Sequence, residues 1–221
     1  MTKIFSHLSP EYQEHCKTFN IVPDNGAFYY SEEIVKNIIP KIKTDRNWVT
    51  VNIPECCWDN SIVFIHNNKN PEHYWWLDKY KNLIIVCSNY KTLRFMCELF
   101  PKFHCILIPL SIDTKYVKQF KAKRKTKKEA YYGRLEKCPK DILEDESITK
   151  IYGKDREKNL REVAKFKTVY SIGRCQLEAL ALGCKVICHE GEYDNIYWKL
   201  LDNSEVVPEL QRLLNEIDGE K

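Results

Sequence analysis

Short apolar runs alternate along the chain with segments whose apolar residues recur every three or four positions. The short runs, rich in valine and isoleucine, are typical of strands buried on both faces, and the longer spacing predicts amphipathic helices. Their alternation predicts an α/β fold with parallel sheets. The expected strands are residues 19–23, 48–53, 61–66, 83–88, 105–110, 129–133, 148–153, 168–171 and 185–189.

The segment after residue 30 illustrates the helical pattern. Ser31 is the expected N-cap of this helix, and Ile34, Ile38 and Ile42 then fall on one face. The other expected helices are residues 91–100, which Pro101 ends, and residues 156–166, 176–182 and 205–217.

A basic segment divides the chain. Residues 114–128 contain eight lysines and arginines and no acid, although the whole chain has a formal net charge of only +4. The strand and helix pattern restarts after this segment. The sequence therefore predicts a first domain at 1–112, a basic linker at 113–128, and a second domain at 129–221 that includes the C-terminal helix.

Composition and hydropathy indicate a soluble globular protein. Hydrophobic residues make up 43% of the chain and charged residues 30%, a balance that disordered chains lack. No apolar run approaches the roughly 20 residues that a bilayer span needs. The first residues lack the apolar core of a signal peptide, so a cytoplasmic location is expected.

The ten cysteines do not form a recognisable metal motif, because no pair has C-x-x-C spacing. Cys184, Cys188 and His189 come closest, but a fourth ligand is missing. Cysteines scattered through an intracellular chain are more often buried apolar residues. We therefore expect no metal site.

The most informative stretch is YSIGRCQLEALALGCKVI at residues 170–187, which predicts a strand, a glycine turn, a helix, a glycine stop and a second strand. Gly173 allows the backbone to approach a ligand, and the N–H groups of the following helix form an anion site. Glu178 lies about one turn into this helix, where a carboxylate can accept hydrogen bonds from ribose hydroxyls. The alternative is an ordinary crossover with an exposed glutamate.

Within this stretch, LEALALGCKVI at 177–187 resembles the donor-binding signature of GT-B glycosyltransferases, the retaining group that includes sucrose synthase and many bacterial cell-surface transferases. VPDNG at 22–26 lies where that family has its first glycine loop, and IHN at 65–67 lies where a histidine follows a strand. The resemblance spans residues 19–190. Three further segments occur in the family's order: LIIVCS at 83–88, IPLSID at 108–113 and YYGRL at 131–135.

This resemblance implies a GT-B-like α/β fold of two small Rossmann-like domains with a cleft between them. It also implies metal-independent transfer of a hexose-like sugar from a nucleotide-diphosphate donor, a UDP-sugar first, to a hydroxyl acceptor, with no other cofactor. His66 and Asp24 are the implied catalytic residues. Glu178 would bind the ribose, and Arg134 and Lys137 would neutralise the diphosphate. The implied donor-binding residues are Gly26, Arg134, Lys137, Gly173, Arg174 and Glu178.

The chain departs from the family pattern in three places. The spacing from Arg134 to Lys137 is shorter than the family's, Tyr170 stands where the family commonly has a second glutamate, and the stretch 133–171 is shorter than usual. These departures favour the alternative of a non-catalytic nucleotide- or nucleic-acid-binding protein derived from a degenerate glycosyltransferase. A Rossmann dinucleotide enzyme fits poorly, because no G-x-G-x-x-G follows an expected strand.

The basic run suggests the acceptor. Tyr116 and Phe120 are interleaved with the cations at 115–128, a composition that suits contact with nucleic acid. A hydroxyl on a modified base of phage or viral DNA is therefore the first candidate acceptor, which would place the protein in the host cytoplasm. A membrane-surface acceptor is the second, and no obligate protein partner is expected. The expected nucleic-acid-binding residues are Lys121, Lys123, Arg124 and Lys125.

Overall fold

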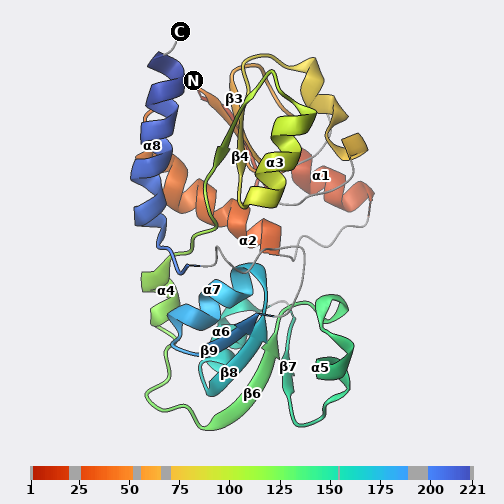
Figure 1. The fold of residues 1–221 in the computed structure, drawn as a ribbon, viewed down its shortest axis with the longest axis vertical. Coiled ribbons are helices and arrows are strands. Elements are labelled where there is room, and N and C mark those ends of the chain that lie inside the picture. The colour runs from red at the N-terminus through yellow and green to blue at the C-terminus, as the bar shows by residue number, and fades with distance from the viewer. Residues whose placement is uncertain are drawn as a thin grey trace. The chain divides into compact units, whose positions relative to one another are not determined.

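The computed structural model of the chain describes residues 2–19, 26–51, 56–65, 71–153, 155–188 and 199–219. It is an α/β protein with two parallel sheets, and it divides into two compact units (Figure 1). Unit 1 contains Met1–Leu110 and Asn203–Lys221, and unit 2 contains Ser111–Asp202. Each unit has its own sheet, as expected for two small Rossmann-like domains.

The sheet of unit 1 has five parallel strands in sequential order, β1-β2-β3-β4-β5. Every residue of the two central strands β3 and β4 is buried. Both faces of the sheet are therefore covered, as their continuous apolar sequences predict. The strands are β1 (Ile4–Phe5), β2 (Asn47–Val49), β3 (Ser61–Ile65), β4 (Ile84–Cys87) and β5 (His104–Leu107).

The remaining elements of unit 1 are helical. The α2 helix continues directly into a π-helical turn, η1, and a 3-10 turn, η2. These elements are α1 (Pro10–Thr18), α2 (Gly26–Glu33), η1 (Ile34–Ile38), η2 (Ile39–Lys41), η3 (Pro71–His73), η4 (Trp75–Lys79), α3 (Tyr90–Leu99) and α8 (Asn203–Gly219).

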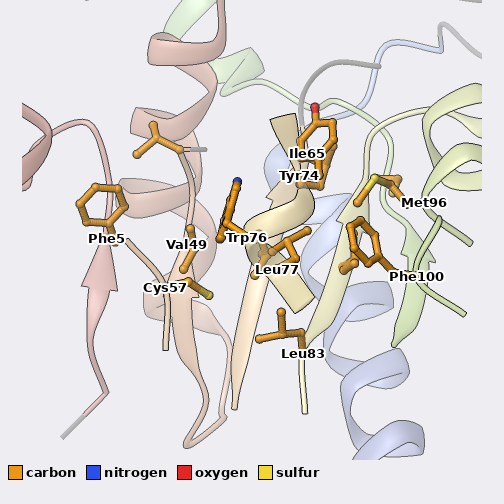
Figure 2. Packing of buried hydrophobic residues seen from close by; sticks show 14 residues of the cluster. Phe5, Val49, Cys57, Ile65, Tyr74, Trp76, Leu77, Leu83, Met96 and Phe100 are labelled. Atoms are coloured by element: carbon orange, nitrogen blue, oxygen red, sulfur yellow. The ribbon is translucent and has the colours of Figure 1, made fainter. Parts of the chain in front are cut away.

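One face of the unit 1 sheet packs against η4 and α3. Figure 2 shows Trp76 and Leu77 of η4 lying between Val49 of β2 on one side and Met96 and Phe100 on the other. All five side chains are buried, and the Trp76 indole donates to the His73 carbonyl at 2.9 Å.

The other face of the unit 1 sheet packs against α2, and α8 packs against the helical turn that continues α2. Tyr30 of α2 makes an edge contact with Phe64 of β3. The α8 helix packs against η1, and its buried residues recur at helical spacing. These residues include Val206, Leu210, Leu214 and Ile217.

The C-terminal helix therefore belongs to unit 1, which corrects its assignment to the second domain. The Arg46 guanidinium is fully buried and donates to Asp218 of α8 at 2.6 Å. The backbone N–H of Lys43 also donates to the Gln211 side chain at 2.7 Å. The sequence shows that α8 has an apolar face, but it does not show which sheet that face covers.

Unit 2 has a four-stranded parallel sheet in the order β7-β6-β8-β9. Both α6 and α7 pack on β8, and α4 packs on α7. The elements are α4 (Thr114–Lys118), β6 (Lys127–Tyr132), η5 (Leu135–Lys137), α5 (Lys140–Glu144), β7 (Thr149–Ile151), α6 (Arg156–Val163), β8 (Phe166–Ser171), α7 (Gly173–Ala181) and β9 (Lys185–Cys188).

Of two predictions near the N-terminus, one falls mostly outside the described residues and the other is wrong. Phe19 is the C-cap of α1, whereas residues 20–23 of the expected first strand lie outside the described residues. The observed first strand, β1, is only two residues long, too short to show a period in the sequence. Ser31 is not an N-cap, because α2 begins at Gly26 and the Ser31 hydroxyl instead bonds Thr50 at 2.6 Å.

The predicted linker is also structured. Asp113 caps α4 by accepting a hydrogen bond from the Tyr116 backbone N–H at 2.8 Å, and β6 already begins at Lys127. The Thr114 hydroxyl donates to the Asp202 carboxylate at 2.6 Å. Residues 113–128 are thus part of unit 2, held by hydrogen bonds that their basic composition does not reveal.

Candidate functional site

The candidate site lies at the carboxyl ends of β6 and β8, which are neighbours in the unit 2 sheet. Tyr132 and Ser171 pair at this end of the two strands. The chain leaves β6 toward β7 on one side of the sheet and leaves β8 toward β9 on the other. Parallel sheets bind ligands at such a switch point, because the diverging connections leave a crevice beyond the strand ends.

The α7 helix begins at this switch point without a capping side chain. Its first residue, Gly173, has a φ of 60°, a conformation that L-residues adopt at a cost of about 1 kcal/mol or more because of their Cβ atom. Ile172 is the N-cap and provides no side-chain hydrogen bond. The first N–H groups of α7 therefore receive no acceptor from the N-cap side chain, and such groups favour an anion.

Two buried polar atoms lie close in sequence to this helix start. Ser171 Oγ and Gln176 Oε1 have no hydrogen-bond partner among the residues that the structure describes. Ser171 is fully buried and Gln176 is 6% exposed. Buried polar atoms normally have partners, so an unsatisfied pair indicates a place for water or a ligand.

Glu178 is the centre of a buried ionic network rather than an exposed carboxylate. Its Oε1 accepts from Arg156 Nε at 2.9 Å and forms an ion pair with Arg174 Nη1, also at 2.9 Å. Its Oε2 accepts from the Tyr132 hydroxyl at 2.5 Å. The Glu178 side chain is 1% exposed, and those of Arg174 and Arg156 are 6% and 15% exposed.

The ionisation of the neighbouring groups follows from this arrangement. Burial, and then the negative charge of Glu178, raise the pKa of Tyr132 well above its usual value. The same two causes raise the pKa of Cys175 to about 12. The Tyr132 hydroxyl therefore remains a hydrogen-bond donor, and Cys175 remains a thiol near neutral pH.

The sequence predicts some of the residues at this edge of the sheet but not others. Gly173, Arg174 and Glu178 all lie in α7, and Arg174 pairs with Glu178, whereas their assignment to the donor stays a prediction. Arg156 and Tyr132 were not expected as site residues. Arg156 begins a predicted helix that follows a strand, so its position at the carboxyl edge of the sheet was the available signal.

Arg134 and Lys137 follow β6 at the same edge of the sheet. Arg134 is half-exposed, with its guanidinium 3.4 Å from the Glu136 carboxylate, and its carbonyl accepts from the Tyr131 hydroxyl at 2.7 Å. Lys137 is the last residue of η5. Their assignment to the diphosphate stays a prediction.

The residues predicted in unit 1 are only partly within the described structure. His66 and Asp24 lie outside the described residues, and Gly26 is the first residue of α2. A different histidine, His7, lies two residues after β1 and is buried.

His7 belongs to a hydrogen-bonded chain. The Thr50 hydroxyl donates to the Phe5 carbonyl at 3.4 Å, so it is left to accept from the Ser31 hydroxyl at 2.6 Å. Ser31 in turn is left to accept from His7 Nδ1–H at 3.0 Å. This order predicts a neutral His7 with its proton on Nδ1. Burial lowers the pKa of His7, and the negative charge of Glu32 opposes this effect.

We expect this histidine to make unit 1 sensitive to acid. The pKa of folded His7 lies below that of the unfolded chain, so the unfolded state binds the proton first as the pH falls below about 6.5. Stability should then decrease by at most about 1.4 kcal/mol per pH unit until the folded pKa is reached. His7→Asn retains a donor for Ser31 and should flatten the dependence of urea midpoints on pH between 7 and 5. An unchanged slope would contradict the assignment.

The basic residues of the predicted nucleic-acid surface fall into two groups. Lys121, Lys123 and Arg124 are exposed. Lys125 instead donates to the carbonyls of Ala164 and Leu182 at 3.1 and 3.2 Å. The Lys125 ammonium thus stabilises the ends of α6 and α7, which corrects the interpretation that all four cations serve one outward surface.

The interleaved aromatic residues also make contacts within unit 2. The Arg156 guanidinium lies 5.1 Å from the Tyr116 ring, and the Arg161 guanidinium lies 4.8 Å from the Phe120 ring. The Tyr116 hydroxyl donates to Glu157 at 3.1 Å. These rings pack against α6, so the nucleic-acid prediction is left to the exposed cations.

The two cysteines of the partial metal motif, Cys184 and Cys188, have different surroundings in the structure. Cys184 is buried and contacts the Lys125 ammonium at 3.2 Å, Cys188 ends β9, and His189 lies outside the described residues. Within the described ranges, no three histidine, cysteine or acidic side chains are grouped to hold a metal ion.

Comparison of the chain with protein-family models, curated proteins and solved structures finds no match. Of the helices in the described part of the chain, none has the length and apolar character needed to span a bilayer.

Proposed function

We propose that the protein is a GT-B-like glycosyltransferase that takes its sugar from a nucleotide-diphosphate donor, with a UDP-sugar as the first candidate. The observation that carries the proposal is the start of α7 at the switch point of unit 2. There a glycine opens a helix that has no capping side chain, beside Arg174 and the Arg156–Glu178 pair. This arrangement suits the diphosphate of such a donor.

The proposed reaction needs charge stabilisation at the diphosphate. The bond between the sugar C1 and the phosphate oxygen breaks, and C1 bonds to the acceptor oxygen, whose proton goes to a base. The leaving nucleoside diphosphate gains negative charge in the transition state. Guanidinium groups and helix N–H groups held in place can stabilise that charge. His66 and Asp24 stay the proposed catalytic residues.

DNA remains the proposed acceptor, as a hydroxyl on a modified base of phage or viral DNA. The exposed side chains of Lys121, Lys123 and Arg124 support it, because phosphate contacts need accessible cations. We expect binding to a short hydroxylated duplex to weaken steeply as salt rises, and Lys123→Ala to reduce the salt slope by about 1. Lys140→Ala, which removes an exposed cation of α5, is the matched control. A slope equal to that of the control would exclude this surface.

A second candidate is a nucleotide-binding protein without transferase activity. It is favoured by Tyr170, near the carboxyl end of β8. This residue stands where the GT-B glycosyltransferases that the sequence resembles commonly have a glutamate. Both candidates require a nucleotide site in unit 2. They differ in whether UDP is released from a UDP-sugar when an acceptor is present.

The first test is calorimetry and thermal unfolding with UDP, GDP and ADP. We expect one nucleotide to bind saturably and to stabilise the protein by about 2.7 kcal/mol at 100 times its Kd. Arg174→Lys should weaken this binding because an ammonium cannot reproduce the planar donor geometry, whereas Lys140→Ala should not. Absence of binding by all three nucleotides would overturn the proposal.

A further inference from the structure

Both carboxylate oxygens of Glu178 are engaged within unit 2. Arg156 donates a hydrogen bond to Oε1 and Tyr132 donates one to Oε2, and Arg174 forms an ion pair with Oε1 at 2.9 Å. The side chain is also only 1% exposed. Recognition of a ribose diol would need two accessible acceptor positions, so the carboxylate as placed here is not a ribose ligand.

These three partners of Glu178 come from three different elements that meet at one edge of the sheet. Tyr132 is the last residue of β6, Arg156 is the first residue of α6, and Arg174 is the second residue of α7. One carboxylate thus fixes two guanidinium groups beside the uncapped start of α7. The fully buried Ser171 Oγ has no partner within the described ranges, so it is an independent polar group near this point that a ligand atom could satisfy.

We propose that Glu178 is a positioning residue, and that unit 2 recognises its ligand through the diphosphate rather than through the ribose. Glu178 holds Arg156 and Arg174 in place before the ligand arrives, so little side-chain entropy remains to be lost on binding. This inference rests on the proposed function, because it assigns the chemistry of the same site. It replaces the ribose contact that the family resemblance implies.

The test compares three probes on the intact protein: UDP, inorganic pyrophosphate and uridine. The Glu178→Gln variant keeps the shape of the side chain but removes its charge. We expect this variant to bind UDP and pyrophosphate about tenfold more weakly, by the same factor for both, because both depend on the positioned arginines. The affinity for uridine, measured by NMR titration, should not change.

Tyr132→Phe provides a second and milder variant. It removes one hydroxyl donor from Glu178 without changing the ring, so the test survives if Glu178→Gln does not fold. We expect a smaller loss that is again equal for UDP and pyrophosphate. Lys140→Ala, in the exposed Lys140–Glu144 pair of α5, is the control and should leave all three affinities unchanged.

Each alternative gives a different pattern. A loss for UDP and uridine with pyrophosphate unchanged would restore the ribose contact and overturn the inference, while the proposed function would stand. Equal losses for all three probes would reduce Glu178 to a structural residue and also overturn the inference. If the unsubstituted protein binds neither UDP nor pyrophosphate, the proposed function itself fails.

Discussion

Leu210→Asp should unfold unit 1 and leave unit 2 folded. Leu210 lies in the middle of α8 and is fully buried. The substitution removes apolar burial that contributes about 1.5–3 kcal/mol and places a carboxylate without a partner in the interior. The expected loss exceeds about 4 kcal/mol, which is most of the stability of an ordinary small domain.

The tryptophans make this result measurable. Trp48, Trp58, Trp75 and Trp76 all belong to unit 1, so the fluorescence change on urea unfolding mainly reports that unit. Amide exchange in β6 and β8 reports unit 2. Asn215→Asp introduces the same charge at an exposed position of α8 and should have little effect. If exchange in β6 and β8 accelerates while the fluorescence transition stays in place, α8 stabilises unit 2 instead.

Glu178→Ala should destabilise unit 2 by about 3 kcal/mol, the cost of leaving buried charges without their counter-ion. Arg156 and Arg174 both lose that counter-ion, and the Tyr132 hydroxyl loses its acceptor. Interpreted from the sequence alone, Glu178 is an exposed ligand-binding residue whose replacement leaves the fold intact. The buried network predicts instead that replacing Glu178 destabilises the fold of unit 2.

Arg134→Ala is the matched comparison, because Arg134 is also a predicted donor-binding residue but forms only a half-exposed pair with Glu136. Its removal should change stability by less than about 0.5 kcal/mol. Amide exchange in β8 as a function of urea measures both effects. Equal, small effects of the two substitutions would show that the buried network contributes nothing to stability.

The strands were predictable because buried strands have short, continuous apolar sequences. The expected segment 61–66 corresponds to β3 (Ser61–Ile65), and the segment 168–171 corresponds to the end of β8 (Phe166–Ser171). The expected helix at 91–100 begins at Tyr90, where Asn89 accepts from the Thr92 backbone N–H at 2.8 Å. Each of these features is set by residues that are close together in the sequence, so a local sequence pattern is enough to predict it.

Only the features of the candidate site that depend on residues close together in the sequence were predictable. The glycine turn and Glu178 follow from one local motif, and both lie at the start of α7 or within it. The partners of Glu178 do not follow from this motif, because Arg156 and Tyr132 are separated from Glu178 by 22 and 46 positions in the sequence. Strand order brings them together, and the sequence does not state that order.

By itself the sequence determined two parallel α/β sheets, their approximate strands, and a helix that follows a glycine turn at a strand end. The tertiary structure decided that α8 covers the sheet of unit 1, that Lys125 stabilises helix ends, and that Glu178 is enclosed by its own arginines. The physical reason is the range of the interactions. Periodicity and turns act over a few residues, whereas the burial of a charge depends on every element that packs around it.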